Sequence, residues 1–126
     1  MKTSRLSAMV APVCLLLLTA CSETSHQPVI VIAGADPARG REAIVRYGCV
    51  ACHAIPGIGN PGSNVGPPLR QFARRAYVGG VVPNMPTDLV AWLIDPPAID
   101  PRTAMPNMGV TQADARDIAA YLYTLQ

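Results

Sequence analysis

The chain has 126 residues, of which 50% are hydrophobic and 14% charged, and its formal net charge is +2. This length predicts one domain. The weak net charge excludes a typical nucleic-acid-binding protein, which needs a strongly basic patch.

Residues 1–20 have the pattern of a secretory signal peptide. Lys2 and Arg5 precede an apolar run over residues 10–18 that is too short to predict a membrane span. The sequence Leu-Thr-Ala-Cys at residues 18–21 resembles the lipobox of bacterial lipoproteins, in which the signal is cut before the cysteine. We therefore expect lipidation of Cys21 and anchoring on the periplasmic side of a bacterial membrane. The alternatives are ordinary cleavage, giving a soluble periplasmic protein with a free Cys21, and an uncleaved anchor.

Without its signal the chain is formally neutral, with eight Arg and eight acidic residues. The charges are unevenly spread: residues 22–77 carry six Arg and three acids, whereas residues 78–126 carry two Arg and five acids. This asymmetry either orients the domain on a partner or belongs to a solvated surface that has no preferred partner.

Residues 21–35 are predicted to be a tether. Its β-branched stretch, residues 29–32, either packs on the domain as an extended strand or is simply linker. The domain proper is expected to span residues 36–126.

The first predicted helix is well delimited. Asp36 is a favourable N-cap, Pro37 suits the first helical position, and we expect the helix to run to about Tyr47 and to end at Gly48. Its buried positions are expected to be Ala43, Ile44 and Tyr47.

Proline and glycine dominate the middle of the chain. Residues 54–68 are predicted to be a loop, followed by a short helix over about residues 68–76 and a break at Gly79-Gly80. Thr87 is the expected N-cap of a second helix covering Asp88 to Ile94, which the prolines after Asp95 terminate.

Residues 95–110 are predicted to form another proline-rich loop before the last helix. That helix is expected to start at Thr111, with Asp114 three residues later as a capping-box-like partner. Its apolar stripe consists of Ile118, Tyr121, Leu122 and Leu125. No alternating strand pattern competes, so we predict an all-α fold of three to five helices with loops wrapped around a prosthetic group.

The prosthetic group follows from Cys49-Val50-Ala51-Cys52-His53, the Cys-x-x-Cys-His attachment signature of c-type haem. Two thiols at this spacing lie on one face of a helical turn and can both bond one porphyrin, and His53 can ligate the iron. A redox disulfide would need a βαβ context. A zinc site would need more ligands than His26, the other histidine.

Whether the iron has a sixth protein ligand distinguishes an electron carrier from a protein that reacts at an open iron position. Met85, Met105 and Met108 are the candidates, and a His/Met pair is typical of electron carriers. We favour Met105, because it lies in the last loop, where the chain can cross the distal face of the haem.

The chain is similar to class I c-type cytochromes, particularly the small bacterial haem domains that occur alone or fused to subunit II of haem-copper oxidases. The matching segments are residues 46–53, Gly66-Pro67-Pro68-Leu69, Asn84, Leu89-Val90-Ala91-Trp92-Leu93, Asp95-Pro96, Thr103-Ala104-Met105-Pro106 and residues 117–122.

The resemblance implies roles for several residues. The carbonyl of Pro67 would accept a hydrogen bond from His53, Leu69 would pack on the porphyrin, and Trp92 would meet a haem propionate. Gly40 and Tyr121 would lie where the first and last helices cross. The family often has Gly at the position of Gln71. Whether Arg74, Arg75 or Tyr77 contact the propionates stays open.

These observations together predict a non-catalytic carrier with one haem c bound through Cys49 and Cys52, which passes single electrons in a respiratory chain. The expected partners are redox proteins, such as a terminal oxidase, and the membrane. The alternatives are an electron-transfer subunit of a periplasmic dehydrogenase, a haem sensor or a peroxidase.

Overall fold

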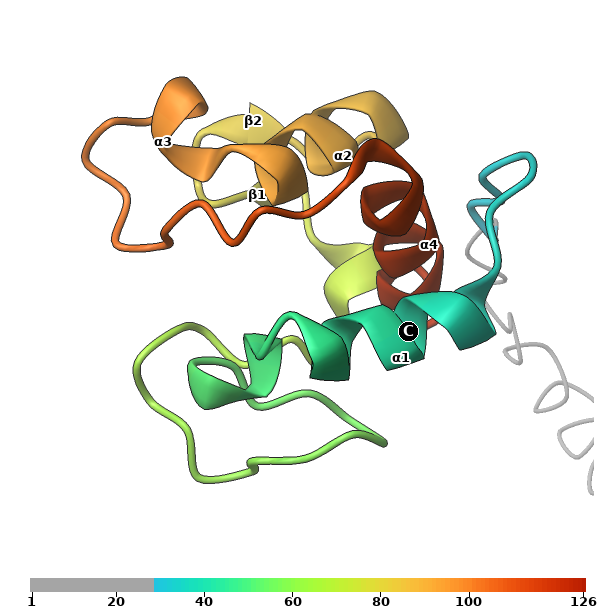
Figure 1. The fold of residues 1–126 in the computed structure, drawn as a ribbon, viewed down its shortest axis with the longest axis horizontal. Coiled ribbons are helices and arrows are strands. Elements are labelled where there is room, and N and C mark those ends of the chain that lie inside the picture. The colour runs from blue at the N-terminus through green and yellow to red at the C-terminus, as the bar shows by residue number, and fades with distance from the viewer. Residues whose placement is uncertain (1–28) are drawn as a thin grey trace, which may run out of the picture.

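The computed structural model describes residues 29–126 (Figure 1). The predicted signal peptide, the predicted lipidation site Cys21 and His26 in the predicted tether lie outside the described residues. Within residues 29–126, no helix is both long and apolar enough to cross a lipid bilayer.

Helix α1, Pro37–Arg46, has the ends that the sequence predicts. The carboxylate of Asp36 accepts a hydrogen bond from the N–H of Ala38 at 2.8 Å, and Pro37 occupies the first turn. Tyr47 caps the C-terminus, and Gly48 then turns the chain with a φ of 71°. This left-handed conformation favours glycine and starts the turn that contains the cysteines.

Helix α4, Gln112–Leu122, crosses α1 closely (Figure 1). As predicted, Thr111 caps it by accepting a hydrogen bond from the N–H of Asp114. A Cβ atom on Gly40 would lie only 2.0 Å from the carbonyl oxygen of Asp117, so the two backbones touch at this glycine. Tyr121 lies one turn further along α4.

The third major helix, α2, Pro86–Ile94, starts earlier than expected. Met85 is its N-cap and Pro86 its first residue, so the prediction of Thr87 as N-cap is wrong. Proline at the first helical position needs no N–H donor and already has a helical φ. A further short helix, α3, Pro96–Ile99, lies inside the predicted 95–110 loop and also begins at a proline.

The region before α2 contains a hairpin that the sequence does not predict. Strands β1, Tyr77–Val78, and β2, Val82–Pro83, pair antiparallel around Gly79 and Gly80, whose φ angles are 58° and 77°. Two-residue strands are too short to show alternation in a sequence. The predicted helix over residues 68–76 is only a 3-10 turn, η3, Phe72–Arg74, because Gln71 before it has a left-handed φ of 51°.

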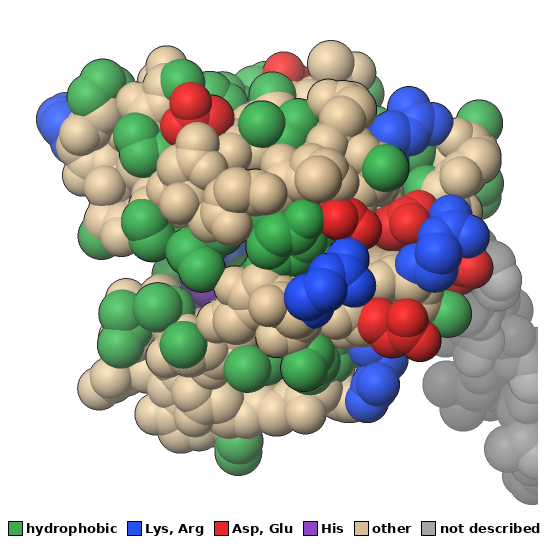
Figure 2. Space-filling model, viewed as in Figure 1, with side chains coloured by type: hydrophobic (Ala, Val, Ile, Leu, Met, Phe, Trp, Pro, Cys, Tyr) green, Lys and Arg blue, Asp and Glu red, His purple; other side chains and the backbone are tan. Residues whose placement is uncertain are grey.

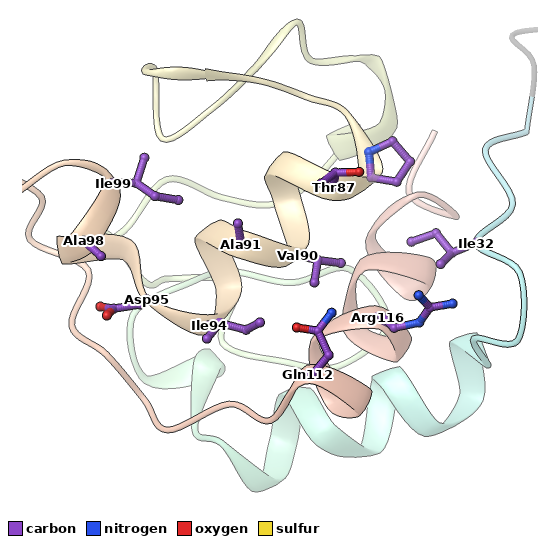
Figure 3. Close-up of a pocket in the computed structure, with 11 residues that line it drawn as sticks. Ile32, Thr87, Val90, Ala91, Ile94, Asp95, Ala98, Ile99, Gln112 and Arg116 are labelled. Atoms are coloured by element: carbon purple, nitrogen blue, oxygen red, sulfur yellow. The ribbon is translucent and has the colours of Figure 1, made fainter.

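The segment before α1 is docked on the domain, which decides between the two alternatives for residues 29–32. Ile30 and Ile32 pack on the core, whereas Val29 and Val31 are 71% and 80% exposed, as in an extended strand, although the segment pairs with no other strand. Arg116 donates a hydrogen bond to the carbonyl of Ala33. Ile32 thereby lines a groove of about 520 Å³ against α2, α3 and α4 (Figure 3).

The core lies between α1, α2 and α4 and confirms the predicted burial of Ala43, Ile44 and Ile118. Buried polar groups tie the C-terminus to the hairpin. The hydroxyl of Tyr123 donates to Asn84 at 3.2 Å, and the amide of Asn84 donates to the carbonyls of Phe72 and Arg75 at 3.0 Å each. Burial raises the pKa of Tyr123 to about 12. The described residues contain four α-helices, so the predicted all-α fold is confirmed.

Candidate haem-binding site

Cys49 and Cys52 lie on one tight turn directly after Gly48. Residues Cys49–Ala51 form a 3-10 turn, η2, and the N–H groups of Cys52 and His53 both donate to the carbonyl of Cys49, at 3.3 and 3.0 Å. Both thiols are free and half-buried. Burial raises the pKa of Cys49, so its thiol is held neutral. Two unpaired thiols that lie close together on one turn can both form covalent bonds to one planar ligand.

The ring of His53 is fixed by its hydrogen bond to Pro67. The distance from Nδ1 to the carbonyl oxygen is 2.7 Å. A carbonyl only accepts, so Nδ1 carries the proton and Nε2 is left with a free lone pair, the arrangement of a metal-ligating histidine. The contact that the resemblance implied between His53 and Pro67 is therefore present.

Gly66 lets the backbone pass against the imidazole. A Cβ atom on Gly66 would lie 2.5 Å from Cε1 and 2.7 Å from Nδ1 of His53, far inside normal contact distance. The N–H of Gly66 donates to the carbonyl of Cys52 at 2.8 Å. The loop that carries Pro67 is thus held directly on the cysteine turn.

Further hydrogen bonds hold the 54–68 loop in place. Asn60 donates to the carbonyl of Val50 at 2.6 Å, Ser63 donates to the carbonyl of Cys52, and Tyr121 donates to the carbonyl of Pro56 at 2.8 Å. Sequence reasoning did not assign Asn60 or Ser63 a role. An isolated polar residue in a loop gives no signal of the backbone group to which the loop returns.

His53 opens into a hollow of the surface. Figure 2 shows a cleft between the part of the molecule that carries α2 and α3 and the part that carries α1 and the 54–68 loop. A histidine side chain is visible inside it, and His53 is the histidine among residues 29–126. Hydrophobic side chains gather along both rims, which suits an apolar, planar ligand.

The three candidate methionines differ in their packing. Met85 and Met108 are 57% and 42% exposed. Met105 is half-buried against the core, and its N–H donates to the hydroxyl of Thr103 at 3.2 Å. Met105 as the sixth ligand stays a prediction.

Trp92 belongs to the buried core, and Leu69 packs against it. Trp92, on α2, is 6% exposed, and its ring packs so closely on Gly79 that a Cβ there would lie 2.4 Å from Cη2. Its indole N–H has no hydrogen-bond partner among residues 29–126. Every side-chain nitrogen that is fully buried within these residues does have a partner. The N–H therefore reaches the surface and is free to donate. Leu69 is half-buried against the core.

The basic residues after Leu69 line a cavity of about 340 Å³, formed by Pro67, Pro68, Arg70, Gln71, Arg74 and Arg75. The guanidinium of Arg75 donates to the carbonyls of Pro68 and Arg70 and lies over the ring of Phe72. Burial, followed by the charge of Arg70, lowers the pKa of Arg75. Arg74 is exposed, and so is Tyr77.

The alternative of a metal held by side chains alone finds no support. Among residues 29–126, no group of three or more His, Cys, Asp or Glu residues is placed to hold a metal ion. Two thiols, one oriented imidazole and a packed thioether remain, and this donor set fits an iron porphyrin.

Comparison with known proteins identifies the family. The cytochrome c family model matches residues 37–126. The chain belongs to the cytochrome c family. Haem c is therefore its cofactor, bound covalently through Cys49 and Cys52, and its chemistry is haem-based electron transfer.

A curated relative is the cytochrome c oxidase subunit 2 of Alkalihalophilus pseudofirmus. It is 29% identical over 89 residues, which cover 70% of this chain and 25% of the relative. The chain thus spans only about a quarter of the length of the curated relative that it matches.

Proposed function

We propose that the protein is a lipid-anchored electron carrier that exchanges single electrons with a membrane redox complex, such as a terminal oxidase, on the periplasmic side of a bacterial membrane. The oxidase subunit relative supports this choice of partner. The lipobox-like sequence ending at Cys21 supports the anchor, which would keep the domain close to membrane partners and raise its effective concentration.

The observation that carries the carrier function is the pair of prospective iron ligands. His53 is oriented by Pro67, and Met105 alone of the three candidate methionines packs on the core. Bound haem supplies the Fe(II)/Fe(III) couple. The chain keeps its own two ligands in place in both oxidation states, so little structural change opposes electron transfer.

A carrier is favoured over a peroxidase or a gas sensor. Either rival needs an open iron position, and a peroxidase also needs an acid–base group near it. His53, the histidine within residues 29–126, already donates a hydrogen bond from Nδ1 to the carbonyl of Pro67, so it is not a free acid–base group.

Optical spectroscopy of the Met105→Ala variant tests this assignment. We expect the oxidised wild type to show a sulfur-to-iron charge-transfer band that the variant lacks, and the reduced variant to bind carbon monoxide rapidly. Met85→Ala and Met108→Ala are matched controls that should keep the band. Rapid carbon monoxide binding by the reduced wild type would refute the carrier proposal.

The partner and the anchor need separate measurements. Cys21→Ser should move the haem protein from the membrane fraction to the soluble fraction. Mass spectrometry of complexes cross-linked in intact membranes should identify oxidase subunits. Recovery of a periplasmic dehydrogenase instead would favour the alternative partner.

A further inference from the structure

A hydrogen-bonded cluster around the carboxylate of Asp114 joins the end of α1 to the start of α4. Oδ1 accepts from the guanidinium of Arg46 at 2.8 Å, and Oδ2 accepts from the hydroxyls of Tyr47 at 2.7 Å and Thr111 at 2.9 Å. The N–H of Thr111 in turn donates to the hydroxyl of Tyr47 at 3.4 Å. The hydrogen bonds from Tyr47, then Thr111, and the Arg46 contact hold the pKa of Asp114 below its usual value, so it is ionised at neutral pH.

The cluster joins the two segments that carry the prospective iron ligands. Tyr47 lies two residues before Cys49, and Thr111 lies six residues after Met105. From Thr103 to Val110 the chain forms neither helix nor strand. A segment without regular structure depends on its ends for its position. On the C-terminal side of Met105, that end is formed by Val110, which is buried in the core, and by Thr111, which contacts Asp114 and Tyr47.

We propose that Asp114 is a positioning residue for the sixth iron ligand. By holding Tyr47 and Thr111 together, its carboxylate would keep the segment that carries Met105 where this side chain can ligate the iron of a bound haem. The inference rests on the proposed function, because it requires Met105 to ligate the iron.

The physical reason is the weakness of a neutral thioether as a ligand. Met105 stays bound because the protein holds it there, so a free ligand in solution competes only with the fraction of molecules in which this segment is open. The apparent affinity of that free ligand therefore rises in proportion to the open fraction. Loss of the Asp114 contacts raises the open fraction without changing the iron or its porphyrin.

Imidazole titration of the oxidised holoprotein measures this fraction. We expect Asp114→Asn to bind imidazole about tenfold more tightly than the wild type, because charge-assisted hydrogen bonds are the stronger ones. Tyr47→Phe, which keeps the Arg46–Asp114 pair, should change the affinity in the same direction by a smaller factor.

Asp88→Asn is the matched control. Asp88 is the third residue of α2, as Asp114 is of α4, and it makes no side-chain hydrogen bond within residues 29–126. Its imidazole affinity should equal that of the wild type.

The outcomes separate the two proposals. A wild type without the sulfur-to-iron band would defeat Met105 as ligand and the inference with it. A wild type that has the band, with Asp114→Asn and Tyr47→Phe no different from Asp88→Asn, would overturn the role of Asp114 alone. If Asp114→Asn does not assemble with haem, Tyr47→Phe decides by the same comparison.

Discussion

Gly66 determines how closely the backbone approaches the imidazole of His53. Replacing it with alanine would place a methyl group 2.5 Å from Cε1, so either the ring or the Pro67 loop must move. We expect Gly66→Ala to destabilise the holoprotein by about 1–3 kcal/mol, the usual cost of overpacking. It should also shift the midpoint potential, because a displaced ring loses its hydrogen bond to Pro67.

Thermal unfolding and redox titration measure the two effects. Gly62→Ala is the control, since nothing lies within 4 Å of a Cβ at Gly62 and its φ is not in the left-handed region. Equal behaviour of the two variants would show that the ring is not held where the structure has it.

Single residues of the site differ in how far sequence predicts them. The spacing of Cys49, Cys52 and His53 by itself predicts haem attachment, and the Pro67 contact follows from family resemblance. Tyr47 illustrates the limit. Its spacing from Ala43 and Ile44 predicted burial, but Tyr47 is only half-buried. Its hydroxyl donates to Asp114, 67 residues away, which only the crossing of α1 and α4 brings near.

The N-terminus of α1 is fastened to α4 through Asp117. Its side chain is nearly buried and accepts from Arg39 at 2.7 and 3.0 Å and from the N–H of Asp36 at 2.7 Å. The hydrogen bonds from Arg39 hold the pKa of Asp117 below its usual value, and the N–H of Asp36 acts in the same direction against the opposing effect of burial. The ionised carboxylate therefore favours the folded state.

The sign of the pH effect follows from this lowered pKa. Well above the unfolded pKa of about 3.9, the carboxylate contributes fully, and its contribution is lost as the pH falls through the lower folded pKa. The difference in free energy of unfolding between wild type and Asp117→Asn should therefore be largest near pH 7. It should start to shrink at about pH 5 and disappear below the folded pKa.

Urea unfolding of both holoproteins across this pH range checks the prediction. Asp88→Asn is the control, because the side chain of Asp88 makes no hydrogen bond or ion pair within residues 29–126. A wild-type advantage that stays constant down to the lowest pH would contradict a role for the ionised Asp117.

Whole elements were predictable where a local signal marks both ends. Asp36, Pro37 and Gly48 delimit α1, and Thr111 starts α4, in agreement with the structure. At α2, proline at the first position outweighed the capping preference of Thr87. The hairpin around Gly79 escaped prediction because it depends on packing under Trp92 rather than on a strand pattern.

The described part of the molecule has two sides separated by the haem cleft. Its buried core is small and mostly aliphatic, with Phe72, Trp92 and Tyr123 as its large aromatic side chains. Figure 2 shows hydrophobic side chains along the rims of this cleft. A domain of this size buries only a modest fraction of its surface, so the porphyrin is a substantial part of the core.

We therefore expect the chain to fold poorly without haem. The Cys49→Ala/Cys52→Ala variant cannot form the thioethers, and its far-UV circular dichroism should lose most of the helical signal of the holoprotein. Stability is a small difference between large terms, so removing one large apolar group suffices to shift the balance. Cys21→Ser, which alters a cysteine outside the haem turn, is the control and should keep the holoprotein signal. A cooperative thermal transition with native helicity in the double variant would show that α1, α2 and α4 form a sufficient core by themselves.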